Sequence, residues 1–417
     1  MNRRARVAPA TVVTYEPETD RPRSGHARFM TTALELAERG RGTTSPNPLV
    51  GCVLVHPAHP GSDHGAIVGR GYHAEAGGPH AEVVALEAAD GFTEGATAYV
   101  TLEPCNHHGR TPPCTEALIE AGVARVVVAT LDPDPRVRGR GVARLREAGV
   151  QVEVGVLADL AEAQNEPYLT AQREGRPWVL YKTATSLDGK TAATSGDARW
   201  VTGPAARDRV HALRGRVDAV AVGIATVLQD DPRLTTRGGH GRTPRKVVFD
   251  GAARTPVDAA LFQPDDANVP ADVTIFVGTD APAERVAALR AAGADVVAPG
   301  GAARPRVAAA LASLHEREVR SLLLEGGGTL AAAFLAANAI DRVAWFLAPT
   351  LVGGDAPTAL AGAGAPRMAD ATALADVTYE AVGDDLLVEG RVVRPGPPDA
   401  ADDASAPTPA PRPGDAT

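Results

Sequence analysis

Two spacings of hydrophobic positions alternate along most of this chain. Short runs of aliphatic and β-branched residues are typical of buried strands, and longer amphipathic segments between them are typical of helices. In the first third of the chain, the pattern predicts strands over residues 50–55, 66–72, 98–102, 123–130 and 150–156. It predicts helices over residues 27–39, 80–89, 115–121 and 142–148. Strands that alternate with helices indicate a three-layer α/β domain.

The same alternation resumes after a polar segment near the middle of the chain. Here the pattern predicts strands over residues 178–184, 217–223, 246–250, 273–278, 321–324 and 342–347. It predicts helices over residues 203–213, 283–292, 306–316 and 330–337. We therefore expect a first α/β domain over residues 25–166, a linker over 167–177 and a second α/β domain over 178–394.

The two ends of the chain have a different composition. Residues 1–24 show no periodicity, and residues 395–417 consist mostly of Pro, Ala, Asp and Ser. Such segments bury too little apolar surface to offset the entropy lost on ordering, so we predict two disordered tails.

Length and charge narrow the class of protein. A chain of 417 residues is expected to form two to three domains. The net charge of -9 argues against an extended nucleic-acid surface but leaves room for local basic pockets that bind a phosphorylated small molecule. The chain has no apolar run long enough to span a membrane and no apolar segment near its start that is typical of a secretory signal.

The cysteine content points to a reducing compartment. The three cysteines, Cys52, Cys105 and Cys114, are too few for a disulfide-stabilised secreted scaffold, so we predict a cytoplasmic protein. Cys52 lies inside an apolar run and is expected to be a buried thiol of the core.

Three metal-binding side chains and one carboxylate follow a spacing that indicates catalytic zinc. His80 and Cys114 each open a predicted helix, and Cys105 follows a predicted strand. One imidazole and two thiolates leave a fourth zinc position for water, whose pKa the metal lowers. Glu82 is placed to pass a proton from that water to a leaving amine. This pattern is the zinc-deaminase signature, and it predicts hydrolytic deamination of a pyrimidine-type ring.

Other interpretations of these residues stay open at this point. Cys105 and Cys114 could form a disulfide, although a cytosolic setting disfavours one. The zinc site could be purely structural, although such sites normally have four protein ligands. His107 or His108 could replace His80, although neither accounts for the carboxylate two residues after His80.

The segment TLEPCNHHGRTPPC, residues 101–114, resembles the bifunctional riboflavin biosynthesis deaminase–reductase family, as do TSPNPLVG at 44–51 and GYHAE at 71–75. The resemblance covers roughly residues 25–395. Most zinc deaminases have two residues between the cysteines, whereas the eight found here match this family's pattern. The resemblance implies a cytidine-deaminase-like fold. It also implies that the substrate is 2,5-diamino-6-ribosylamino-pyrimidinone 5′-phosphate. The zinc ligands it implies are His80, Cys105 and Cys114, and it makes Glu82 the proton donor.

A glycine loop in the second domain is suited to a phosphate. The predicted strand 321–324 leads through Glu325 into Gly326–Gly328 and then into a helix from Thr329. A glycine loop before a helix N-terminus presents bare backbone N–H groups to an anion. The alternative is a tight turn that needs a positive φ, although three consecutive glycines favour close approach of a ligand.

Residues 186–190 (SLDGK) and 223–237 resemble the reductase half of the same family, whose fold is similar to that of dihydrofolate reductase. The resemblance implies hydride transfer from NADPH to an opened ribosyl group, which becomes ribityl. Implied cofactor contacts are Ala184, Trp200, Thr226, Asp230, Gly327, Gly328, Thr329, Leu330, Ala331, Ala332 and Ala333. Implied substrate contacts are Ala198, Arg214, Leu234, Arg237 and Glu325.

Four of the reductase residues raise separate questions. Arg214 and Arg237 fit recognition of the 5′-phosphate, because a guanidinium pairs with phosphate oxygens; the alternative is a solvated surface charge. Ala198 stands where family members often carry Ser, so a hydroxyl contact is lost there. Lys182 could polarise the sugar carbonyl or could be a structural ion-pair partner.

Together these features predict a two-domain cytoplasmic enzyme with one zinc ion per chain and NADPH as cofactor. Its expected partner is a phosphorylated pyrimidine, with no nucleic acid and no membrane, and the resemblance implies a homo-oligomer. One rival is a nucleobase, nucleoside or RNA deaminase fused to an unrelated domain. Another is a non-enzymatic protein with structural zinc, which would have no use for Glu82.

Overall fold

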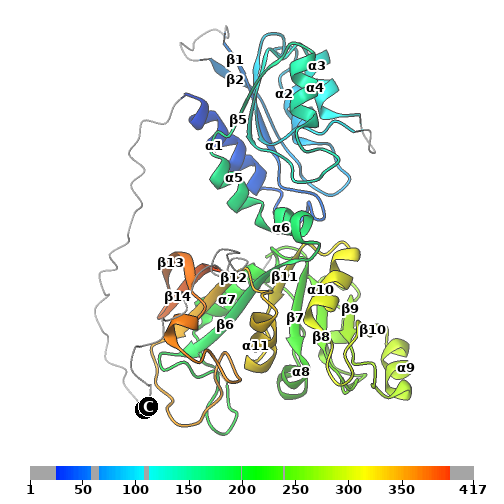
Figure 1. The fold of residues 1–417 in the computed structure, drawn as a ribbon, viewed down its shortest axis with the longest axis vertical. Coiled ribbons are helices and arrows are strands. Elements are labelled where there is room, and N and C mark those ends of the chain that lie inside the picture. The colour runs from blue at the N-terminus through cyan, green and yellow to red at the C-terminus, as the bar shows by residue number, and fades with distance from the viewer. Residues whose placement is uncertain (1–24, 58–64, 108–111, 199, 238–239, 395–417) are drawn as a thin grey trace, which may run out of the picture.

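The structure is a computed structural model that describes residues 25–57, 65–107, 112–198, 200–237 and 240–394. The two predicted tails and His108 lie outside these residues. Figure 1 shows two α/β units, one above the other, with helix α6 (Glu166–Glu174) between them.

The first unit is a five-stranded mixed sheet covered by helices on both faces. Its strands lie in the order β2-β1-β3-β4-β5, with β1 antiparallel to β2 and β3, and with β3, β4 and β5 parallel. The strands are β1 (Gly51–His56), β2 (Ala66–Tyr72), β3 (Thr97–Leu102), β4 (Arg125–Thr130) and β5 (Gln151–Val154). The helices are α1 (Gly25–Glu38), α2 (Ala81–Ala88), α3 (Cys114–Glu120), α4 (Arg140–Glu147) and α5 (Ala158–Gln164).

Side chains of β1 point alternately to the two faces of the sheet, so this strand contributes to the core on both faces. Cys52 and Leu54 pack on the face covered by α2, α3 and α4, while Val53 and Val55 pack on the face covered by α1 and α5. The prediction that Cys52 is a buried core thiol is confirmed. Full burial of an aliphatic side chain contributes about 1.5–3 kcal/mol, so the central strands hold α2 and α3 firmly. Those two helices carry His80 and Cys114 at their N-termini.

The second unit is a nine-stranded sheet in the order β10-β9-β8-β7-β11-β6-β12-β14-β13. The strands from β10 to β12 are parallel, and β14 and β13 form an antiparallel hairpin at the far edge. The strands are β6 (Trp178–Ser186), β7 (Ala219–Gly223), β8 (Arg245–Phe249), β9 (Val273–Phe276), β10 (Asp295–Val297), β11 (Ser321–Leu324), β12 (Arg342–Ala348), β13 (Leu374–Val382) and β14 (Asp385–Val392).

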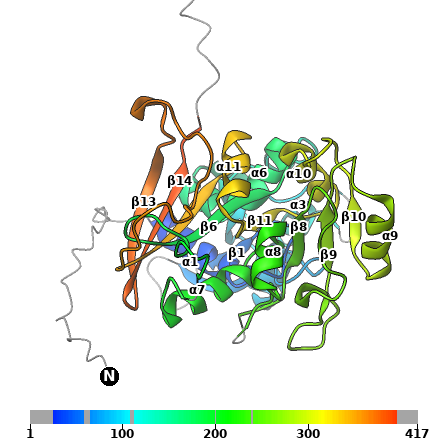
Figure 2. The ribbon, with the colours of Figure 1, turned by 90° about the horizontal axis from the view of Figure 1, so that it is seen from below.

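Helices cover both faces of this second sheet (Figure 2). Residues of α7, α8 and α9 pack into one core layer, and residues of α10 and α11 pack into the other. The helices are α7 (Pro204–Arg214), α8 (Ile224–Asp230), α9 (Ala283–Ala291), α10 (Val307–Glu316) and α11 (Gly328–Ala336), with two 3-10 turns at Ala260–Phe262 and Met368–Asp370. The predicted α/β class of both units is confirmed.

Several elements were not predicted. The segment that we interpreted as a linker forms helix α6, in which Pro167 occupies a first-turn position that tolerates its missing N–H. Buried Asn165 holds the start of α6, since its amide bonds both the N–H and the carbonyl of Leu49, each at 2.8 Å. The hairpin β13–β14 was also missed. β13 is largely exposed and lacks the period of a half-buried strand, whereas β14 does alternate in burial and could have been predicted. The short elements α5, α8 and β10 were not predicted either.

The two units contact each other through an ion pair and through a close approach of their backbones. Glu38 of the first unit pairs with Arg216 of the second at 2.7 Å. Gly42 has φ +89°, and a Cβ there would lie 2.6 Å from the carbonyl oxygen of Gly215. The loop that precedes the TSPNPLVG segment thus lies against the end of α7. Among the residues described, no helix has both the length and the apolar character needed to cross a membrane.

Candidate active sites

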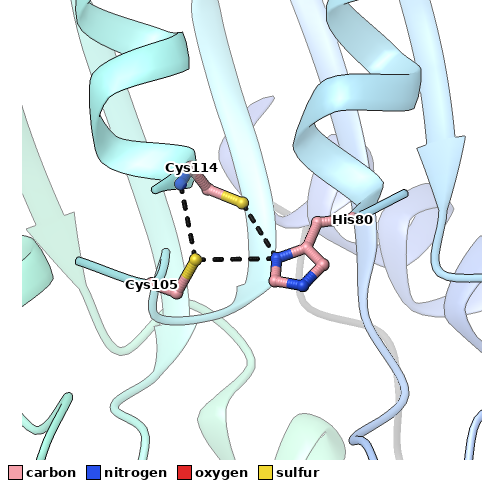
Figure 3. A group of neighbouring side chains, drawn as sticks. All are labelled: His80, Cys105 and Cys114. Carbon is pink, nitrogen blue, oxygen red and sulfur yellow. Dashed lines mark hydrogen bonds between the residues drawn. The ribbon is translucent and has the colours of Figure 1, made fainter. Parts of the chain in front are cut away.

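His80, Cys105 and Cys114 come together at one end of the first sheet (Figure 3). His80 is the N-cap of α2, Cys114 begins α3, and Cys105 lies in the loop after β3. His80 Nδ1 lies 3.1 Å from Cys114 Sγ and 3.6 Å from Cys105 Sγ, and the candidate ligand atoms all lie within 4.8 Å of one another. Ligand atoms on a tetrahedral zinc lie about 3.5–3.8 Å apart. The three side chains therefore fit one zinc ion.

The charges of this cluster also fit a divalent cation. Hydrogen bonds from the thiol and the backbone N–H of Cys114, and from His80, lower the pKa of Cys105 to about 4. The same bond to Cys105, together with burial and the nearby Glu82 carboxylate, raises the pKa of Cys114. Two thiolates beside a carboxylate repel one another, and a bound cation removes that repulsion.

Glu82 lies inside the first turn of α2 and is almost fully buried. Burial, followed by the charge on Cys105, raises the pKa of Glu82 to about 7. Its carboxyl group also hydrogen-bonds with the Cys114 side chain. A carboxyl group with a pKa near neutrality, next to three metal ligands, is suited to accept and return a proton.

The structure bears on two of the open interpretations of these residues, the disulfide and His107 as a ligand. All three cysteines are free thiols, so the disulfide interpretation of Cys105 and Cys114 is wrong. Within the described residues, the metal-binding cluster comprises His80, Cys105 and Cys114, and His107 is not a member of it.

A histidine–asparagine pair lies beside the cluster, and sequence reasoning assigned it no role. The His73 ring lies 5.6 Å from the His80 ring, measured between centroids. His73 Nδ1 is 3.0 Å from the Pro79 carbonyl, and its Nε2 is 3.0 Å from the Asn47 amide nitrogen. The carbonyl fixes Nδ1 as the protonated nitrogen, so Nε2 accepts from Asn47. The segments 44–51 and 71–75 were the signal for this pair.

A buried carboxylate next to the cluster organises the loop that faces it. Glu103 accepts backbone hydrogen bonds from Asp132, Gly139 and Val142 at 3.3, 2.9 and 3.1 Å. These bonds link the loop after β3, which carries Cys105, to the loop after β4 and to the start of α4. Backbone hydrogen bonds to Glu103 therefore hold the loop that carries Cys105 against the loop after β4 and the start of α4.

In the second unit, a largely buried group of charges lies where β6 and β11 run side by side. Arg214, at the end of α7, forms a bidentate ion pair with Glu325, at 2.6 and 3.0 Å. Burial raises the pKa of Glu325, but the charge and hydrogen bonds of Arg214 outweigh it, and the net pKa is lowered. Burial lowers the pKa of Lys182, which also senses the charges of Glu325 and Arg214. The three side chains thus form one electrostatic group.

A third cation, Arg237, and a histidine, His211, lie close to this group. The pKa of His211 is lowered by burial and by the charges of Arg214 and Arg237. The His211 ring nitrogen and an Arg214 N–H both lie near the Thr235 carbonyl, at 3.2 and 3.1 Å. The structure therefore brings together the two arginines that the sequence singled out, along with a histidine that it did not.

The three glycines after Glu325 differ in their surroundings. A Cβ on Gly326 would lie 2.8 Å from the Leu330 side chain, and one on Gly328 would lie 2.5 Å from the Thr358 carbonyl. Gly327 is the N-cap of α11, and a Cβ there would meet nothing within 4 Å. None of the three has a positive φ, so a simple turn does not require them. The open position at Gly327 is the one that a ligand can approach.

The remaining predicted residues occupy the same end of the sheet or the loops that follow it. Ala184 lies on β6, Thr226 and Asp230 lie on α8, and Leu234 is buried in the loop after α8. Residues 329–333 form the first turns of α11. Ala198 and Trp200 lie between β6 and α7; Trp200 is 70 % exposed, and the Arg207 guanidinium lies 4.4 Å from the centre of its ring. In parallel sheets, this carboxyl end of the strands is where ligands bind.

Comparison with known families identifies both units. A family model described as the cytidine and deoxycytidylate deaminase zinc-binding region matches residues 23–130. A model described as the RibD C-terminal domain matches residues 177–388. The first match covers His80, Cys105 and Cys114, and the second covers the buried charges and the glycine loop.

Comparison with whole proteins gives matches over nearly the full length of both chains. The chain is 41 % identical to riboflavin biosynthesis protein RibD of Actinobacillus pleuropneumoniae, over 88 % of this chain and 95 % of the relative. It is 41 % identical to the Escherichia coli K12 protein of the same name, over 86 % and 97 %.

Two solved structures extend this similarity to the fold. Acinetobacter baumannii RibD has a TM-score of 0.76 and 38 % identity, over 89 % of this chain and 99 % of that one. A Thermotoga maritima diaminohydroxyphosphoribosylaminopyrimidine deaminase/5-amino-6-(5-phosphoribosylamino)uracil reductase has a TM-score of 0.73 and 34 % identity, over 88 % and 99 %.

Proposed function

The chain belongs to the RibD family of bifunctional deaminase/reductases in riboflavin biosynthesis, and from this premise we propose how its own residues carry out the two reactions. We propose that the deaminase spans residues 25–166 and the reductase 178–394. The observation that carries the proposal is the convergence of His80, Cys105 and Cys114 next to buried Glu82.

The first reaction is hydrolysis of a ring amino group. We propose that it converts 2,5-diamino-6-(5-phosphoribosylamino)pyrimidin-4-one and water to 5-amino-6-(5-phosphoribosylamino)uracil and ammonia. Zinc, when held by His80, Cys105 and Cys114, supplies a water of lowered pKa. Glu82 takes the proton of the attacking water and passes it to the leaving nitrogen, a role for which a buried carboxyl group beside the three ligands is suited. The hydrogen-bonded side chains of His73 and Asn47 pack beside His80 and restrict the movement of its ring.

The second reaction reduces the ribosyl group of that product to ribityl. NADPH, when bound, supplies the hydride. We propose that the N–H groups at Gly327–Gly328 and the first turns of α11 receive its phosphates, and that Ala184, Trp200, Thr226 and Asp230 complete the cofactor site. The choice of NADPH over NADH is part of this proposal.

The buried charges of the reductase have separate tasks in this scheme. We propose that Lys182 polarises the carbonyl of the opened sugar; burial lowers its pKa, which would ease donation of a proton to the oxygen. Arg237 and the remaining N–H groups of Arg214 face the substrate 5′-phosphate, with Glu325 fixing the Arg214 guanidinium. Ala198 and Leu234 complete the substrate contacts.

The cellular setting follows from the same family. We propose a cytoplasmic homo-oligomer that acts on a phosphorylated pyrimidine and binds neither nucleic acid nor membrane. Its free thiols agree with a reducing compartment.

Product mass tests the whole scheme. The full chain is incubated with the diaminopyrimidinone phosphate, first without and then with NADPH. We expect the deaminated product alone in the first case and the ribityl product only after NADPH is added. A reduced product that forms without deamination, or no product in either case, would contradict the proposal.

A further inference from the structure

The segment SLDGK, residues 186–190, takes no part in the mechanism above, yet it makes a dense set of contacts. Ser186 ends β6, and residues 187–190 form the turn after it. The Asp188 side chain contacts both Ser186 and the segment that follows β12, residues 349–361. Figure 1 shows these two segments, green and orange, at the same end of the second sheet as α11. The contacts join parts of the chain that are more than 160 residues apart.

Asp188 binds backbone with both of its carboxylate oxygens. Oδ1 accepts from the Val352 N–H at 3.1 Å, and Oδ2 accepts from the Gly353 N–H at 2.7 Å. The Ser186 hydroxyl donates to Oδ1 at 2.6 Å and so fixes the carboxylate from the other side. Gly353 has φ +74°, a conformation that favours glycine and that turns its N–H toward the carboxylate. This arrangement is a carboxylate clamp on a backbone turn.

Polar contacts, rather than core packing, fix this part of the segment. Leu351 is 76 % exposed, and Leu187 is 64 % exposed. The Leu187 N–H donates to the Thr350 carbonyl at 2.8 Å, and the Thr191 N–H donates to the Pro357 carbonyl at 2.8 Å. Because so little apolar surface is buried here, the charge-assisted hydrogen bonds to Asp188 contribute much of the stabilisation that keeps Val352 and Gly353 in place.

The other end of the same segment packs against the glycine loop. The Ala361 N–H donates to the Gly328 carbonyl at 3.1 Å. A Cβ on Gly328 would lie 2.5 Å from the Thr358 carbonyl and 3.0 Å from the Ala361 nitrogen. The buried Tyr181 hydroxyl anchors this end, since it donates to the Ala359 carbonyl at 2.6 Å. The segment is therefore the outer support of the N-terminus of α11.

We propose that Asp188 is a positioning residue of the reductase: by clamping Val352 and Gly353, it holds segment 349–361 against Gly328 and so sets the cofactor-binding geometry of the glycine loop. The inference rests on the proposed NADPH-dependent function of this site. Asp188 acts through the segment and touches no reacting atom. Loss of the clamp therefore weakens cofactor binding without changing the chemical step.

The clamp carries its negative charge at neutral pH. The Ser186 hydroxyl and the Gly353 and Val352 N–H groups hold the pKa of Asp188 down to about 2. Since the folded pKa lies below the ordinary value, the clamp's contribution is present above that ordinary value and is lost only as pH falls toward 2. Cofactor affinity should therefore show no titration of Asp188 between pH 6 and 9.

The test measures steady-state kinetics of reduction by the full chain, with NADPH and the deaminated substrate varied in turn. Asp188→Asn puts an NH2 group where one oxygen accepts a backbone N–H, and Gly353→Ala disturbs the same clamp from the opposite side. We expect both variants to raise the KM for NADPH at least about tenfold. We expect kcat at saturating NADPH, the KM for the pyrimidine and the deamination rate to stay unchanged.

The matched control is Asp295→Asn, which removes a partly exposed ion pair with Arg317 at the edge strand β10, five strands away from β6, and should leave every constant unchanged. An unchanged KM for NADPH in both clamp variants, with the wild type active, overturns this inference alone. An equal fall of kcat and deamination, together with a lower Tm, assigns Asp188 a merely structural role and also overturns it. A wild-type chain that performs no NADPH-dependent reduction overturns the proposed function itself.

Discussion

At the residue scale, Glu82 shows what spacing predicts and what it leaves out. Its position two residues after His80 led us to propose it as the proton carrier, but spacing gives no pKa. That property comes from its burial against α3 and from the charge on Cys105. The metal ligands were predictable because each lies at a helix start or strand end that the hydrophobic pattern marks. The Asn47–His73 contact was not: segments 44–51 and 71–75 marked both residues, but only the tertiary fold brings them together.

Glu82→Gln should separate metal binding from turnover. The amide keeps the shape of the side chain and leaves the three ligands intact, so zinc content should remain near one ion per chain. Ammonia release should fall by at least about 100- to 10,000-fold, because the proton carrier is lost. The control is Glu87→Gln, an exposed residue of the same helix, which should leave both quantities unchanged. Unaltered ammonia release in Glu82→Gln would remove the role assigned to Glu82.

Glu325→Gln should lower stability as well as reduction. The change leaves Arg214 and Lys182 as neighbouring buried cations without their anion, at a cost of about 3–5 kcal/mol in the free energy of unfolding. Denaturant unfolding measures this loss. Glu380→Gln, in an exposed pair with Arg209, is the comparison and should cost less than about 1 kcal/mol. If both variants lost the same small free energy of unfolding, Glu325 would not be electrostatically coupled to Arg214 and Lys182.

At the element scale, the hydrophobic pattern located most helices and strands but not their environment. It missed β13, which is largely exposed, and it took α6 for a linker because that segment is polar and contains Pro167. It also treated Gly326–Gly328 as one feature. The structure gives these glycines three different surroundings: Leu330 crowds Gly326, Gly327 is open, and residues 358–361, which no local pattern connects to the loop, crowd Gly328.

Gly327→Ala and Gly328→Ala should therefore behave differently. Gly327 has room for a Cβ and an ordinary extended backbone, so its substitution should leave Tm unchanged and raise the KM for NADPH, because the methyl group occupies the approach of the cofactor. Gly328→Ala collides with the Thr358 carbonyl, so it should lower Tm and weaken NADPH binding together. Thermal unfolding and reductase kinetics of the two variants decide the matter. An unchanged KM in Gly327→Ala would place the cofactor phosphates elsewhere.

At the scale of the whole molecule, the two catalytic centres belong to different sheets with separate cores. Removing zinc with a chelator should abolish ammonia release and leave NADPH-dependent reduction of separately supplied deaminated substrate intact. Both rates are measured on the same treated sample, and added zinc should restore the first. Parallel loss of both activities would show that the reductase half depends on the metal.

The contact between the two units, formed around Gly42 and Gly215, is also a property of the whole molecule, and no sequence pattern predicted it. Gly42→Ala adds a methyl group 2.6 Å from the Gly215 carbonyl at a residue with φ +89°. We expect the variant to have a lower Tm and faster proteolytic cleavage near α6, since the units can no longer meet closely. Gly149→Ala also falls on a positive φ but has open space around its Cβ, so it controls for backbone strain alone. The same cleavage rate in both variants would rule out a tight joint.

The central claim is that the His80, Cys105 and Cys114 centre uses water to replace the ring amino group. The most direct measurement is the mass of the product formed by the full chain in ¹⁸O-labelled water without NADPH. The account predicts a deaminated pyrimidine that carries one ¹⁸O atom in place of the amino nitrogen, with one ammonia released for each. A deaminated product without the label, or an unaltered substrate from protein that holds its zinc, would contradict it.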